Sequence, residues 1–118
     1  MVGIVSVTVV ETPEFLSATR KLLDDADRAL LVDHLAWDPA AGDLIPGTGG
    51  VRKLRWALAG RGKRGGARVV YFYHDARMPL FILTAYAKND QNDLSQQDRN
   101  DFKQLTGQLV ESFKRTRK

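Results

Sequence analysis

The chain has 118 residues, of which 43% are hydrophobic and 27% are charged, and its net charge is +4. This balance is typical of one globular domain over residues 1–118 that buries its own core, and it excludes a disordered chain. The absence of cysteine excludes a disulfide scaffold, a thiolate metal site and a cysteine nucleophile.

The first half of the chain predicts one strand and two helices. Residues 3–10 are mostly β-branched and predict a strand. A Thr-Pro pair, which is typical of a helix N-terminus, precedes apolar residues at helical spacing, and this pattern predicts a helix over residues 15–23. Asp24 begins a second helix, which ends before Pro39.

The middle of the chain predicts three strands. Residues 39–50 are rich in glycine and proline, so we expect a loop there. We expect strands over residues 51–58, 67–74 and 80–88, which short turns separate. Short connections of this kind favour an antiparallel meander.

The C-terminal segment predicts a last helix. Ser95 and Asp98 resemble a capping box. One apolar stripe follows at helical spacing and consists of Phe102, Leu105, Leu109 and Phe113. The element order β-α-α-β-β-β-α predicts an α+β fold. In it an antiparallel sheet carries its helices on one face and leaves the other face open to solvent or a ligand.

Composition argues against a metal and against a membrane. The only histidines, His34 and His74, lie forty residues apart, so we expect no metal site, and we expect no other cofactor. No apolar run approaches the ~18–20 residues of a membrane span. The N-terminus lacks the basic segment and cleavage site of a signal peptide. We therefore expect a cytoplasmic protein without a membrane partner.

The positive charge is concentrated in one segment. The 31 residues between Asp43 and Asp75 contain seven basic side chains and no acidic one. The other 87 residues contain eleven basic and fourteen acidic side chains. A neutral-to-acidic body with one basic segment indicates a polyanionic partner, either a nucleic acid or a strongly acidic protein.

Two cations share a face of the first strand in this segment. Side chains alternate along a strand, so Lys53 and Arg55 point the same way and the large apolar residues point the other way. The sequence does not set the register of the next strand, so whether Arg68 joins them stays open. If it does, the sheet presents several cations for phosphate beside tyrosines that can stack on bases. The alternative is an ordinary solvated sheet face.

The glycine-rich run at residues 60–66 contains three cations. Its spacing matches a dinucleotide-binding fingerprint, but that fingerprint must open a helix, and here a β-rich run follows. It is no P-loop either, because arginine follows the lysine. We interpret the run as a flexible basic turn whose bare amides suit a phosphate chain. The alternative is a solubilising hairpin turn.

Several short runs from Asp43 onward are characteristic in combination. They are Ile-Pro-Gly-Thr-Gly-Gly at 45–50, Arg-Lys-Leu-Arg-Trp at 52–56, Gly-Arg-Gly-Lys-Arg-Gly-Gly-Ala-Arg-Val-Val-Tyr at 60–71, Tyr-Ala-Lys at 86–88 and Asp-Leu-Ser at 93–95. With the order of elements, these runs resemble the RelE/ParE superfamily of bacterial toxins, and most closely its HigB-like branch. The resemblance implies a RelE-like fold and the toxin of a type II toxin–antitoxin pair.

The same resemblance implies an activity and partners. The activity is that of a ribosome-dependent mRNA endoribonuclease, in which a 2′-hydroxyl attacks the adjacent phosphate without a metal. Translation is thereby inhibited. The implied partners are the ribosome, mRNA and a cognate antitoxin, which is expected to be a small DNA-binding protein encoded by the adjacent gene.

The resemblance also assigns roles to residues of this chain. The implied catalytic residues are Lys53, Arg55, Arg68, Tyr86 and Lys88. The implied RNA-binding residues are Arg52, Arg61, Lys63, Arg64, Tyr71 and Tyr73. Arg55 and Arg68 are expected to clamp the phosphate, and Lys53 is the candidate base. Some family members have an arginine where this chain has Asn89, and a tyrosine where it has Leu94.

Two other functions stay open at this stage. A ParE-like protein of the same fold would poison DNA gyrase and cleave no RNA. A basic RNA-binding module would use the same arginines without catalysis. The density of cations on the sheet favours the endoribonuclease over the gyrase poison, because a poison directed at a protein needs no cage for phosphate.

Overall fold

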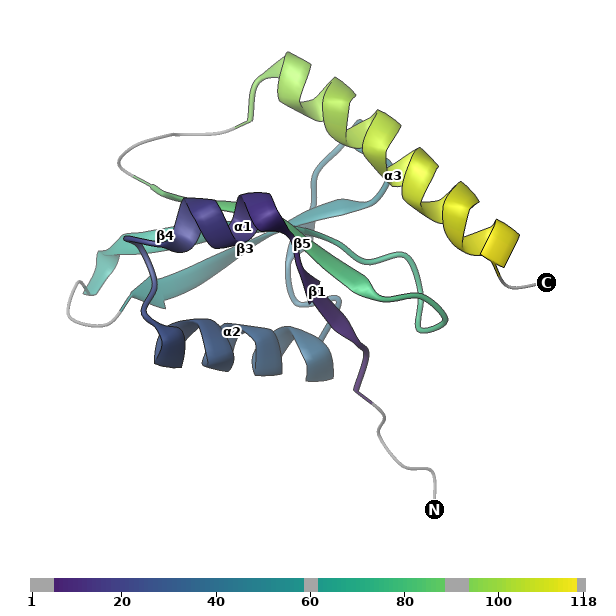
Figure 1. Ribbon diagram of the computed structural model, residues 1–118. Coiled ribbons are helices and arrows are strands. Elements are labelled where there is room, and N and C mark those ends of the chain that lie inside the picture. Colours follow the sequence, from purple (N-terminus) through teal and green to yellow (C-terminus); the bar gives the residue numbers. More distant parts are fainter. Residues whose placement is uncertain (1–5, 59–61, 89–93, 117–118) are drawn as a thin grey trace.

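The three central strands form the predicted antiparallel meander in the computed structural model of the protein, which describes residues 6–58, 62–88 and 94–116 (Figure 1). In chain order, the elements are β1 (Val9–Glu11), α1 (Pro13–Thr19), α2 (Asp25–Trp37), β2 (Asp43–Leu44), β3 (Val51–Leu58), β4 (Gly62–Phe72), β5 (Leu80–Ala87) and α3 (Gln96–Thr116). The five strands form one sheet in the order β1-β5-β4-β3-β2.

The edges of the sheet differ from the prediction of a purely antiparallel sheet. β1 pairs in parallel with β5, with Val9 opposite Leu80. Parallel neighbours need a long connection, and the chain passes through both N-terminal helices and three other strands before it forms β5. β2 lies in the predicted loop and adds two residues to the edge of β3. Such a short strand has no alternation that a sequence pattern could reveal.

The prediction that residues 60–66 form a turn is wrong from Gly62 onward. β4 begins at Gly62, which pairs with Leu58 after a shift of register beyond Trp56. Strand pairing uses backbone groups, so a glycine-rich segment can extend a hairpin although its composition is typical of turns. The rest of the predicted turn, up to residue 61, lies outside the described residues.

The N-terminal helices begin where the sequence predicts. Thr12 caps α1, because its side chain accepts a hydrogen bond from the Phe15 amide at 3.2 Å. The same hydroxyl donates to the Ile82 carbonyl at 2.7 Å, and this bond ties the start of α1 to β5. Asp24 caps α2 by accepting from the Asp27 amide at 2.7 Å. The predicted break between the helices is confirmed, although α1 is shorter than expected.

Helices cover both faces of the sheet, so the prediction that all of them lie on one face is wrong. Val69 and Tyr71 of β4 belong to a core that α1 and α2 cover, whereas Val70 and Phe72 belong to a second core under α3. All four side chains are fully buried. Because both faces of β4 are apolar, each face needs a covering layer. Figure 1 shows α2 and α3 on opposite sides of the sheet.

Two threonines join α3 to the loop before β3. The Thr106 hydroxyl donates to the Thr48 carbonyl at 3.0 Å, and the Thr48 side chain accepts from the Val51 amide at 3.1 Å. The predicted capping box at the start of α3 is confirmed, because the Asp98 amide donates to the Ser95 hydroxyl at 3.0 Å and the Ser95 amide donates to the Asp98 carboxylate at 3.1 Å. The Thr106 bond therefore ties α3 to the loop, and the capping box stabilises the first turn of the helix.

The segment before β2 is bound by Tyr71 of β4 and Arg52 of β3. The Gly42 amide donates to the Tyr71 hydroxyl at 2.7 Å, and the Arg52 guanidinium donates to the Gly42 carbonyl at 2.8 Å. A Cβ atom at Gly42 would lie 2.9 Å from the Lys53 carbonyl oxygen and 2.9 Å from a Tyr71 ring carbon. A side chain at this position would clash with the backbone of Lys53 and the ring of Tyr71, so the position favours glycine.

Tyr71→Phe tests this contact. The substitution leaves the buried Gly42 amide without its acceptor, so we expect the free energy of unfolding to fall by about 1–3 kcal/mol at neutral pH. Burial raises the pKa of the Tyr71 hydroxyl above its ordinary value of 10.0. The native state therefore holds this proton more tightly than the unfolded state, and the wild type loses stability as the pH rises above about 10.

The difference in unfolding free energy between wild type and Tyr71→Phe should consequently shrink at alkaline pH. Urea unfolding, followed by tryptophan fluorescence at neutral pH and above pH 10, measures it. A difference that stays constant or grows with pH would contradict the prediction.

Candidate nucleic-acid interface

The register of the central strands brings the predicted cations together. Arg55 of β3 lies opposite Arg68 of β4, which in turn lies opposite Tyr86 of β5. Directly opposed residues in antiparallel strands point to the same face, with Cα atoms about 4.5–5.5 Å apart. Lys53 is two residues from Arg55 and shares this face. Arg68 therefore joins Lys53 and Arg55, and we call Lys53, Arg55, Arg68 and Tyr86 the basic cluster.

The basic cluster is accessible from solvent and lies on the α3 side of the sheet. Arg55 is exposed, Lys53 and Arg68 are half-buried, and Tyr86 is 9% exposed. Lys88 follows β5 and is exposed, and its amide donates to the Gly66 carbonyl at 3.2 Å. That bond puts its backbone at the same end of the sheet as Arg68.

The two opposed arginines place like charges on neighbouring strands. Among the described residues, neither Arg55 nor Arg68 forms an ion pair with a carboxylate. Arg77, in the turn between β4 and β5, instead binds Asp75 at 2.9 Å, and the resulting hydrogen bonds hold the pKa of that carboxyl below its usual value. Like charges directly opposite each other destabilise a sheet. A bound anion such as phosphate would remove this repulsion.

Three predicted RNA contacts lie on the other face. Tyr71 has no exposed surface and its hydroxyl binds the Gly42 amide, so its assignment as an RNA contact is wrong. Arg52 is the cross-strand neighbour of Tyr71, and its guanidinium donates to the Gly42 carbonyl. Tyr73 packs against the core under α1 and α2. Side chains alternate, so residues one position away from the basic cluster point away from it.

The remaining predicted contacts are Arg61, Lys63 and Arg64. Arg61 is outside the described residues, as are the side chains of Lys63 and Arg64, whose backbone belongs to β4. Sequence reasoning missed Asp43 and Thr84. Asp43 of β2 lies opposite Lys53 of β3, and Thr84 of β5 lies opposite Val70, which is the partner of Lys53 in β4. No local pattern marks either of them, because only strand pairing makes them neighbours of the cluster.

The histidines have packing partners. The ring of His34 lies 5.6 Å from that of Trp56, and the ring of His74 lies 6.2 Å from that of Phe72.

Within residues 6–58, 62–88 and 94–116, no group of three or more histidine, cysteine, aspartate or glutamate side chains could hold a metal ion. None of the helices in the described part of the chain is both long and apolar enough to cross a membrane.

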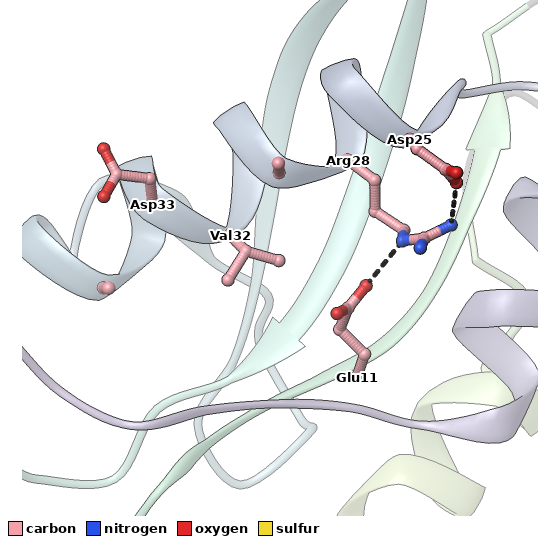
Figure 2. Close-up of a pocket in the computed structure, with 7 residues that line it drawn as sticks. Glu11, Asp25, Arg28, Val32 and Asp33 are labelled. Carbon is pink, nitrogen blue, oxygen red and sulfur yellow. Dashed lines mark ion pairs between the residues drawn. The ribbon is translucent and has the colours of Figure 1, made fainter.

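A hollow of about 440 Å³ between β1 and α2 has the opposite charge (Figure 2). Arg28 lies between two carboxylates, with its guanidinium 2.9 Å from Glu11 and 3.3 Å from Asp25. Asp33 adds a third carboxylate to the lining, beside the apolar Val32. Carboxylates outnumber cations here, so a polyanion is repelled. A phosphate chain therefore fits the basic cluster and not this hollow.

Arg55→Ala tests whether the basic cluster binds RNA phosphates. Each phosphate contact contributes about 0.7 to the slope of log K against log salt concentration for single strands. We expect this variant to bind single-stranded RNA more weakly, with a slope lower by about 0.7. Fluorescence anisotropy of a labelled RNA over a salt series measures it. Arg77→Ala is the matched control, since Arg77 is exposed but ion-paired, and an equal effect of both variants would contradict the assignment.

Comparisons with known proteins agree with this fold. A family model described as the RelE toxin of the RelE/RelB toxin–antitoxin system matches residues 15–116. Among solved structures, a mutant of the E. coli toxin RelE in the free state aligns with a TM-score of 0.52 at 18% identity, covering 74% of this chain and 88% of that chain. This structural likeness shows a shared fold. With the family match over most of its length, the chain belongs to the RelE family of toxins from toxin–antitoxin systems, within the RelE/ParE superfamily.

Proposed function

We propose that this toxin inhibits translation as a metal-independent endoribonuclease that cleaves mRNA on the ribosome. The observation that carries the proposal is the pair of Arg55 and Arg68, which lie directly opposite each other beside Lys53 and Tyr86 and have no carboxylate partner among the described residues. Natural sheets avoid such like-charge pairs unless an interaction elsewhere compensates for the repulsion. The phosphate of an RNA strand provides that compensation.

The proposed reaction uses the RNA's own nucleophile. The 2′-hydroxyl attacks the adjacent phosphorus, the bond from phosphorus to the 5′-oxygen breaks, and a 2′,3′-cyclic phosphate and a 5′-hydroxyl result. A base must take the proton of the 2′-hydroxyl, and an acid must give one to the departing 5′-oxygen. Negative charge grows on the phosphate in the transition state, so fixed cations there lower the barrier.

The cluster can supply these functions from one face of the sheet. In this proposal Arg55 and Arg68 hold the phosphate from neighbouring strands, and Lys53 accepts the proton of the 2′-hydroxyl. Tyr86 or Lys88 donates the proton to the leaving oxygen, since both lie at the β5 side of Arg68. No step requires a group from the opposite face, where Tyr71 has a structural role.

The partners follow from the family. We propose a RelB-like antitoxin that neutralises this toxin, because the matching family model describes a RelE/RelB pair. The ribosome and mRNA are the proposed targets, and the concentration of cations at β3 and β4 suits RNA. Placement in the HigB-like branch stays a prediction from the runs at residues 45–50 and 60–71.

Arg68→Ala tests the proposed activity. Removing one group that stabilises transition-state charge slows a reaction by about 10²–10³-fold. Mapping of RNA 5′ ends after brief induction in a bacterium should show new ends inside translated regions with the wild type and few with Arg68→Ala. Ribosome binding should persist in this variant, because affinity is spread over many cations. Arg77→Ala serves as the control and should cleave like the wild type.

The other outcomes separate the alternatives. Growth arrest without new RNA ends would reject the endoribonuclease and favour a gyrase poison. A third outcome is that neither the wild type nor Arg68→Ala cuts RNA, while Arg68→Ala loses ribosome binding and toxicity to the same extent. This result would indicate a binding module without catalysis.

A further inference from the structure

A small cavity adjoins the basic cluster on the β5 side. It has a volume of about 160 Å³. Three distant segments supply its walls, namely Glu14 of α1, Thr84 and Tyr86 of β5, and Asp98 and Phe102 of α3. This volume, compared with about 440 Å³ for the hollow between β1 and α2, limits the cavity to a group of about the size of one ring system.

Both rows of cross-strand neighbours that contain the cations end at this cavity. The row of Arg55 and Arg68 ends at Tyr86, and the row of Lys53 ends at Thr84. Neighbouring strands lie about 4.8 Å apart, so the cavity is about one strand spacing from Arg68. A nucleotide whose phosphate is bound by Arg55 and Arg68 could therefore place its base in the cavity.

The lining suits a base and not a second phosphate. Phe102 is half-buried and provides aromatic surface on which a base can stack, and Tyr86, which is 9% exposed, forms part of the same wall. The two carboxylates would repel phosphate but accept hydrogen bonds from the amino group of a base. Their presence next to cations is difficult to reconcile with a surface that only attracts RNA phosphates.

Glu14 is the carboxylate that is available for recognition. Asp98 already accepts the Ser95 amide at 3.1 Å as part of the helix cap. Glu14 is exposed, and within the described part of the chain its side chain forms no hydrogen bond and no ion pair. Its position in the first turn of α1 is set by Thr12, which binds the Ile82 carbonyl of β5. The backbone of Glu14 is therefore held near β5, while no hydrogen bond or ion pair in the described part of the chain occupies its carboxylate.

We infer that this cavity binds one base of the mRNA beside the cleaved phosphate, and that Glu14 selects bases with an exocyclic amino group. Adenine, cytosine and guanine carry such a group, whereas uracil has none and carries carbonyl oxygens in its place, with one ring N–H between them. The inference rests on the proposed endoribonuclease activity and makes Glu14 its specificity-determining residue. Cleavage should then disfavour uracil at one position next to the cut.

Glu14→Gln is the test. The substitution keeps the shape of the side chain but replaces one acceptor oxygen with a donor, which can bind a uracil carbonyl. We expect the bias against uracil at that position to fall on the order of tenfold, as for the loss of one specific base contact. The readout is the frequency of each base around the cut sites in mapped RNA 5′ ends, normalised to the total number of cuts.

Glu111→Gln is the matched control, because Glu111 is an exposed glutamate of α3 that does not line the cavity. It should leave the base frequencies unchanged. Thr84→Val provides a second variant at a residue of β5 that lines the cavity, and it should also alter the base frequencies among the cuts that remain.

The outcomes separate the inference from the activity on which it rests. A wild type that cuts RNA without a bias against uracil would overturn the inference and leave the endoribonuclease intact. A Glu14→Gln variant with unchanged base frequencies would do the same. A wild type that cuts no RNA would overturn both. A bias that weakens in Glu14→Gln and persists in Glu111→Gln would support the inference.

Discussion

The pairing of β4 between β3 and β5 is the constraint on which both the core and the candidate site depend. A slip of one residue in this register would turn every side chain of β4 to the other face of the sheet. Arg68 would then enter the core under α1 and α2, and the buried Val69 would take its place opposite Arg55. The fully buried side chains on both faces of β4 oppose such a slip. Hydrophobic packing therefore sets the geometry of the cations.

The basic cluster itself opposes folding. Two arginines face each other across β3 and β4, and no carboxylate among the described residues neutralises them. The packing of α3 on the same face compensates, since Phe102 and Leu105 pack on the core that contains Phe72. One face of the sheet thus combines an apolar core that stabilises the fold with a charged cluster that is available for a polyanion.

Acidic and basic groups are concentrated on opposite sides of the sheet. The hollow beside α2 is acidic, with Glu11, Asp25 and Asp33 around Arg28, and lies on the side of the N-terminal helices (Figure 2). The basic cluster lies on the opposite side of the sheet. A molecule with charges separated in this way approaches a polyanion with its basic side first, because the acidic side is repelled.

Much of the fold follows from local patterns in the sequence. The sequence predicted the three central strands, alternation predicted the shared face of Lys53 and Arg55, and caps at Asp24 and Ser95 predicted two helix starts. Each of these signals depends on residues within one turn or strand. Tertiary structure alone decided that Arg68 joins that face, that Tyr71 is buried, and that α3 covers the second face. It also brought Glu14 beside Tyr86. Register and helix placement depend on contacts between segments far apart in the chain, and no local pattern contains them.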